Sequence, residues 1–174
     1  MSLDQFPDFD IQALYAAVDA ERRSREMNWQ QVAREISSRL KSVPARPISP
    51  STLSGMRNRR IVEGDGVLQM LLWLRRTPES FVPGNEAPAV IAKLPDVPEA
   101  GILRFDTAAL YLARDAQRIN RGMTWKQVAH EIGGVNPAGL TRLSKGGRTA
   151  FPEVMRIVRW LGRPAASFTR LSNW

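Results

Sequence analysis

The sequence contains no cysteine and a single histidine, and these two scarcities exclude several kinds of site. Without cysteine there is no disulfide framework, no thiolate nucleophile and no thiolate ligand for a metal. One histidine, His130, cannot supply the several imidazoles that zinc enzymes use. The sequence therefore predicts no metal site and no bound cofactor.

Long hydrophobic runs are also lacking. The longest such run, residues 67–74, is interrupted by Gln69 and is far shorter than the ~20 residues that a membrane-spanning helix needs. Residues 1–10 carry three aspartates and no basic side chain, which is the reverse of a secretory leader. We therefore expect no membrane association and a cytoplasmic location, associated with the nucleoid if the partner is DNA.

Acidic residues are the minority charge. The 174 residues include 25 lysines and arginines against 17 aspartates and glutamates, which gives a formal net charge of +8. This balance favours a polyanionic partner, although ribosomal, membrane-surface and merely soluble proteins share it. The length fits one or two small domains.

An internal repeat is the most informative feature that is present. Sliding the sequence by 96 residues aligns residues 9–36 with 105–132, and 17 of the 28 positions are identical. After Ile36 the offset falls to 87, so the first copy carries nine extra residues before Ile48. Because a duplicated sequence predicts a duplicated fold, each copy is expected to form the same structural unit.

Residues 83–104 separate the copies and contain four prolines, which disfavour continuous helix or central strand. We interpret them as a linker between a first domain, residues 1–82 with an extended loop at 37–47, and a second domain, residues 105–174. The second domain is the more basic, with eleven basic and four acidic residues against twelve and ten in the first. A linker of 22 residues could let both domains reach one binding site.

Apolar residues recur at helical spacing in both copies, and strand-like alternation is absent. The fold class predicted is therefore all-α, with five helices in each copy. Their expected ranges are 10–24, 29–39, 50–57, 64–76, 78–82, 106–121, 125–132, 137–144, 152–161 and 164–169. The residues expected in the core are Val32, Ile36, Leu53, Met56, Met70, Leu74, Val128, Ile132, Leu140, Leu143, Ile157 and Leu161.

Helix starts are marked by capping residues. Thr124 and Gln127 have capping-box spacing, and Asn28 with Gln31 stands at the same place in the first copy. Ser49-Pro50 and Asn136-Pro137 each put a cap residue before a proline at the first helical position. Gly133-Gly134 is expected to end its helix with positive φ angles.

The segment MTWKQVAHEIGGVNPAGLTRLSKGGR, residues 123–148, resembles the helix-turn-helix of phage-repressor and Cro-like proteins, the xenobiotic-response-element (XRE) family of bacterial regulators. The signature positions are filled by Thr124, Ala129, Gly133, Val135, Leu140 and Gly146. In the first copy they are Asn28, Ala33, Ile48, Ser49 and Leu53, with Ser37 and Arg59 in place of glycines. The resemblance implies two tandem five-helix domains of the lambda-repressor type.

The same resemblance implies that the helices 137–144 and 50–57 are recognition helices for double-stranded DNA. A short capped helix that stands out from a helical core fits the major groove, which is about 12 Å wide. In the second copy the expected DNA-contacting residues are Thr124, Trp125, Lys126, Asn136, Ala138, Thr141, Arg142, Lys145 and Arg148. Arg142 is the one expected to read guanine, while Lys145 and Arg148 contact phosphate.

In the first copy the expected DNA-contacting residues are Asn28, Trp29, Ser49, Ser51, Ser54, Arg57, Asn58, Arg59 and Arg60. Because Ser51 and Ser54 are small and four polar or basic residues follow the helix, this copy is expected to hold the DNA backbone rather than to read bases. Trp29 and Trp125 have an alternative interpretation as packing residues, and the basic run 57–60 as a hydrated helix exit.

We interpret the protein as a transcriptional regulator with two DNA-binding units in one chain, which could also form a homodimer. The alternative is a protein-interaction module, such as an antitoxin or anti-activator, that grips a partner protein with the same helical scaffold. An enzyme is not expected, because no nucleophile or acid/base constellation appears in the sequence.

Overall fold

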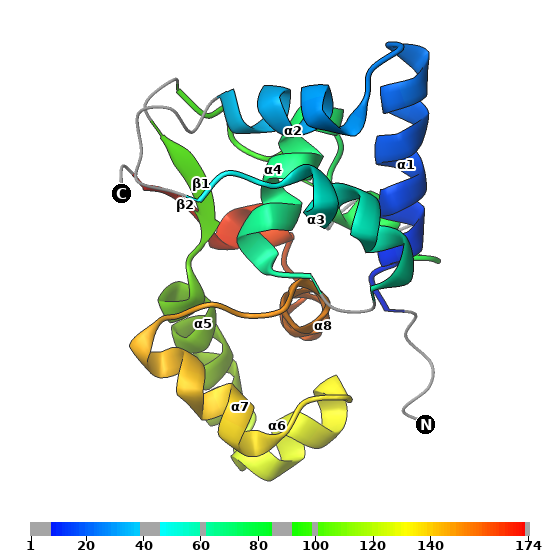
Figure 1. The fold of residues 1–174 in the computed structure, drawn as a ribbon. Helices are drawn as coiled ribbons and strands as arrows, with labels where there is room; N and C mark the ends of the chain where they lie inside the picture. The colour runs from blue at the N-terminus through cyan, green and yellow to red at the C-terminus, as the bar shows by residue number, and fades with distance from the viewer. Residues whose placement is uncertain (1–7, 39–45, 60–61, 85–91, 99–100, 173–174) are drawn as a thin grey trace.

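A computed structural model describes residues 8–38, 46–59, 62–84, 92–98 and 101–172, and it is mostly helical (Figure 1). Within these described residues, the first copy forms four α-helices and two 3₁₀ helices. They are α1 (Ile11–Ser24), α2 (Trp29–Ser38), α3 (Pro50–Gly55), η2 (Met56–Asn58), α4 (Gly64–Leu74) and η3 (Pro78–Phe81).

The second copy repeats this order of elements. They are α5 (Thr107–Asn120), α6 (Trp125–Ile132), α7 (Pro137–Arg142), η5 (Leu143–Lys145), α8 (Phe151–Leu161) and η6 (Ala165–Phe168). The helices expected from the sequence are therefore all present in the described residues, with ends that differ by a few residues. The predicted helices 50–57 and 137–144 each become a short α-helix followed by a 3₁₀ turn.

The capping residues predicted from the sequence are confirmed. Thr124 and Gln127 form a reciprocal capping box at α6, and the Asn28 and Gln31 side chains make the same two bonds at α2. The Ser49 hydroxyl accepts from the Thr52 N–H at α3, and the Asn136 side chain accepts from the Gly139 N–H at α7. Each bond satisfies a backbone donor that the first turn of a helix leaves free.

A two-stranded antiparallel sheet is the element that the sequence did not predict. Strand β1 (Ile102–Phe105) pairs with β2 (Thr169–Ser172), with Ile102 opposite Ser172 and Phe105 opposite Thr169. Three of the four β1 residues are buried, so the strand has no alternation of buried and exposed positions. Part of the predicted linker is therefore ordered and packed, because Leu94, Ile102 and Leu103 are buried.

The two copies share one buried core. The rings of Phe9 in the first copy and Phe151 in the second lie 4.5 Å apart, and Phe105 lies 5.3 Å from Phe151. Helix α4 packs against α8, and α4 also contacts β1 through a 3.0 Å hydrogen bond from the Gln69 side chain to the Leu103 carbonyl. Of the core residues predicted from sequence, Leu74, Ile132 and Leu161 are partly buried and the other nine are buried.

A short backbone bridge joins the copies at the start of α4 and α8. Glu63 lies opposite Ala150 in an isolated antiparallel bridge. On either side, the Gly64 N–H donates to the Thr149 carbonyl and the Phe151 N–H donates to the Val62 carbonyl, both at 3.1 Å. The bridge therefore fixes the first turns of α4 and α8 beside one another.

Candidate nucleic-acid interface

Helix α7 is held on the core by one face and exposes the other. Leu140 and Leu143 are fully buried between α7, η5 and the rest of the second copy. The predicted base-reading residues Ala138, Thr141 and Arg142 are all exposed. Because Asn136 caps the helix through the Gly139 N–H, the exposed side chains sit on a helix with a defined start.

The basic residues after α7 are exposed as well, and one of them has an acidic partner. Lys145 ends η5 on the surface. The Arg148 side chain is 75% exposed and lies 3.1 Å from the Glu63 carboxylate of the first copy. An ion pair this exposed contributes little stability, so Arg148 can exchange Glu63 for another anion at small cost.

Helix α3 has the same architecture with smaller exposed side chains. Leu53 and Met56 are fully buried, whereas Ser51 and Ser54 are exposed. The basic or polar residues Arg57, Asn58 and Arg59 follow on the surface, and Ser49 caps the helix. Arg60 and most of the predicted loop 37–47 lie outside the described residues.

The starts of α2 and α6 carry the two predicted tryptophans. Trp29 stacks on Tyr15 and Trp125 stacks on Tyr111, with ring centroids 5.9 Å and 5.6 Å apart. Both indoles are half-buried, so they pack against the first helix of their own copy. The neighbouring residues Asn28, Thr124 and Lys126 are exposed.

A buried arginine contacts α7, and no sequence motif indicated it. Arg114 of α5 is 0% exposed, and its Nη2 donates to the Leu140 carbonyl. Its guanidinium also lies over the rings of Tyr111 and Trp125. Burial lowers the pKa of Arg114 to about 10. The alignment of the two copies could have indicated that Arg114 is buried, because it places Arg114 opposite an apolar residue, Val18.

A second arginine ties the turn before α7 to the first copy. Nη1 of Arg156 on α8 donates to the Gly134 carbonyl at 3.1 Å, and Nε donates to the Asp8 carboxylate at 2.6 Å. The hydrogen bonds from Arg156 hold the pKa of Asp8 below its ordinary value. Gly133 and Gly134 both have positive φ angles, as the sequence predicts for this turn.

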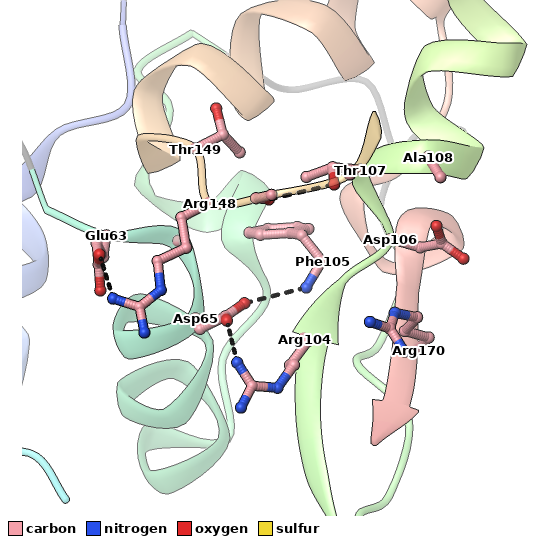
Figure 2. Close-up of a pocket in the computed structure, with 13 residues that line it drawn as sticks. Glu63, Asp65, Arg104, Phe105, Asp106, Thr107, Ala108, Arg148, Thr149 and Arg170 are labelled. Atoms are coloured by element: carbon pink, nitrogen blue, oxygen red, sulfur yellow. Dashed lines mark hydrogen bonds and ion pairs between the residues drawn. The ribbon is translucent and has the colours of Figure 1, made fainter. Parts of the chain in front are cut away.

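A groove of about 660 Å³ lies where the two copies meet, and it is lined by charged residues in equal numbers (Figure 2). The Asp65 carboxylate accepts from Arg104 at 2.9 Å and from the Phe105 N–H at 3.2 Å. Arg148 pairs with Glu63, and the Thr107 hydroxyl donates to the Gly147 carbonyl. Since Glu63, Asp65 and Asp106 offset Arg104, Arg148 and Arg170, the groove has the character of a junction between copies rather than an anion site.

Comparisons of the chain with family models, with curated proteins and with solved structures gave no match. Among the described helices, none is both long enough and apolar enough to cross a bilayer. The inference of function therefore depends on the geometry of the two helical units.

Proposed function

We propose that the protein is a sequence-specific DNA-binding transcriptional regulator that places α7, and with it α3, in the major groove. The observation that carries the proposal is the division of α7 into two faces. Leu140 and Leu143 anchor the helix on the core, while Ala138, Thr141 and Arg142 face solvent.

The exposed side chains have the chemistry that DNA recognition needs. An arginine can bond the O6 and N7 of guanine with its two parallel donors, and the threonine methyl can contact thymine. Lys145 at the end of η5 is suited to a phosphate, which would set the position of the helix on the duplex. Bound over or beside a promoter, such a protein would block or position the polymerase.

Selection of duplexes from a random library, followed by mobility-shift titration at moderate salt, tests the proposal. We expect enrichment of a defined sequence that binds about 10³-fold or more tightly than random DNA. Weak binding that is equal for selected and random duplexes would contradict it. The measurement needs a salt series, because counterion release alone gives any basic protein some affinity for DNA.

One observation favours the alternative, a protein-interaction module. Leu112 and Ile119 of α5 are 66% and 61% exposed, and they are seven positions apart, about two helical turns, so they lie on one helix face. The first copy has Ala16 and Arg23 at these positions. If the protein is a DNA-binding regulator, the double variant Leu112→Ser, Ile119→Ser should select the same DNA sequence as wild type. If the alternative holds, neither protein should select a DNA sequence, and the double variant should lose its regulatory effect.

A further inference from the structure

The hydrogen bonds that join the two copies are reciprocal. In the repeat alignment Val62 is equivalent to Thr149, and Gly64 is equivalent to Phe151. The bond from the Gly64 N–H to the Thr149 carbonyl therefore becomes the bond from the Phe151 N–H to the Val62 carbonyl when the copies are exchanged. Contacts that map onto themselves in this way define a twofold relationship.

The larger elements obey the same relationship. Helix α4 contacts its own counterpart α8, and η3 contacts its own counterpart η6. Glu63 and Ala150, which lie opposite one another at the bridge, are also equivalent positions. A head-to-tail arrangement would instead bring non-equivalent elements together. The two copies are therefore related by a pseudo-twofold axis that passes between Glu63 and Ala150.

This axis also relates α3 to α7 and limits how far apart they lie. Glu63 lies five positions after Asn58, the end of η2, and Ala150 lies five positions after Lys145, the end of η5. At ~3.6 Å per residue each span reaches at most about 18 Å, and about 4.5 Å separates the paired Cα atoms of Glu63 and Ala150, so the two helix ends lie within about 41 Å of one another. Figure 1 shows α3 and α7 on opposite sides of the contact between α4 and α8. Successive turns of a major groove are about 34 Å apart.

We propose that a single chain binds one inverted pair of half-sites, about one helical turn apart, with α7 on one half-site and α3 on the other. This inference rests on the proposed function. The orientation is inverted rather than direct because a twofold axis, unlike a translation, reverses the direction of the second unit. The spacing is fixed because the shared core and the bridge join the copies as one packed body.

The two half-sites are unequal. The α3 residues equivalent to Ala138, Thr141 and Arg142 are Ser51, Ser54 and Gly55. Gly55 offers no donor where Arg142 offers a pair of them. The half-site under α7 therefore carries most of the base preference, and the half-site under α3 contributes mainly backbone contacts.

The first experiment uses the duplex enriched from the random library. Native mass spectrometry gives the stoichiometry, and mobility shifts compare the enriched duplex with versions in which the weaker half-site is reversed or moved by five base pairs. We expect one chain per duplex, and about threefold weaker binding after either change, because only the Ser51 and Ser54 hydroxyls of α3 can bond base edges. Reversal of the half-site under α7 should weaken binding about tenfold or more. Two chains on one inverted site, or equal binding to direct and shifted arrangements, would overturn the inference while leaving the proposed function intact. Failure to enrich any sequence would contradict both the proposed function and the inference about half-sites.

The second experiment links the two copies covalently at the pseudo-twofold axis. Glu63 and Ala150 form a pair flanked by hydrogen bonds, for which the Cα atoms lie about 4.5 Å apart in antiparallel strands. That separation suits a disulfide, and the chain has no other cysteine to compete. The double variant Glu63→Cys, Ala150→Cys, when oxidised, should bind the enriched duplex within about twofold of its reduced form.

The reduced form of the same variant is the matched control, and Glu63→Ala controls for the lost pairing with Arg148. Loss of tenfold or more on oxidation would show that the copies must separate on DNA, and would overturn the inference. Failure of the two cysteines to couple under an oxidant would contradict the bridge itself, and the inference with it.

Discussion

The guanidinium of Arg114 donates a hydrogen bond to the Leu140 carbonyl, and so ties helix α5 to the exposed helix α7. The bond leaves Nε and Nη1 of Arg114 without a hydrogen-bond partner among the described residues. The side chain of Arg114 is fully buried, and the equivalent residue of the first copy is a valine, Val18. A buried charge with so few partners costs stability, so its retention points to a role in positioning α7.

Replacing Arg114 with methionine should leave the free energy of unfolding within about 1 kcal/mol of wild type, or raise it, since a buried charge is exchanged for an apolar chain of similar length. Arg114→Ala should lose about 2 to 4 kcal/mol because it leaves a cavity. Urea unfolding at pH 8 measures both. A large loss in the methionine variant would show that the charge itself stabilises the fold.

The same pair gives a pH prediction. Burial lowers the pKa of Arg114 in the fold to about 10, so the cost of its charge is fully present below that pH. Between about pH 10 and the ordinary arginine value the unfolded chain binds the proton and the folded chain does not, so stability rises with pH. Wild type should therefore gain stability relative to Arg114→Met between pH 9 and pH 11. Equal pH profiles would contradict this.

Glu79 gives a prediction at the acidic end. It is buried where η3 meets η6, with its Oε1 accepting from the Ala165 N–H at 2.7 Å and its Oε2 unpaired among the described residues. Burial raises the pKa of Glu79. Its contribution is therefore favourable below the ordinary glutamate value and is lost as pH rises through the folded pKa. Glu79→Gln should gain thermal stability over wild type as pH goes from 4 to 7, measured by the difference in Tm.

Most local structure could be predicted from the sequence, because the signals for it are local. Ser49-Pro50 and Asn136-Pro137 mark helix starts through bonds that span three residues, and the structure contains those bonds. The exposure of Ala138, Thr141 and Arg142 follows from the helical spacing around Leu140 and is present as well. These residues needed no knowledge of distant contacts.

The rest could not be predicted because it depends on pairing between distant segments. β1 and β2 lie at opposite ends of the second copy, and the burial of β1 does not alternate. The ring of Phe9 packs on Phe151, which no spacing within either copy indicates. Arg114 is missed for another reason, since an arginine in a helix is ordinarily expected at the surface.

Arg75 and Gly162 occupy equivalent C-terminal positions of α4 and α8, and both have left-handed backbone with φ of 55° and 65°. Glycine adopts this conformation without steric cost, whereas residues with a Cβ do not. We expect Arg75→Gly to stabilise the protein by up to about 1 kcal/mol and Gly162→Ala to destabilise it by about the same amount. Thermal unfolding of the two variants checks this. Changes of the same sign would refute the comparison.

Gly64 tests the junction between the copies. A Cβ at this position would lie 2.9 Å from the Phe105 ring and 3.2 Å from the Thr149 carbonyl oxygen, both in the second copy's part of the junction. Gly64→Ala should therefore strain the bridge and lower the free energy of unfolding by about 1 to 3 kcal/mol. Gly66→Ala is the matched control, because a Cβ there meets nothing within 4 Å. Equal stability of the two variants would contradict the close approach.

Arg142 and Lys145 are both exposed at the end of the α7–η5 segment, but we expect them to act differently on DNA. If Arg142 reads a guanine, Arg142→Ala should cost about 1 to 3 kcal/mol on the selected duplex and little on random DNA. If Lys145 contacts a phosphate, Lys145→Ala should weaken binding to selected and random DNA alike, and should reduce the dependence of log affinity on log salt by about one unit.

Arg163→Ala, which removes one charge outside both helix-turn-helix segments, is the control. Mobility-shift titrations across a salt series measure all three, and identical losses on selected and random DNA for Arg142→Ala and Lys145→Ala would reject the division of roles.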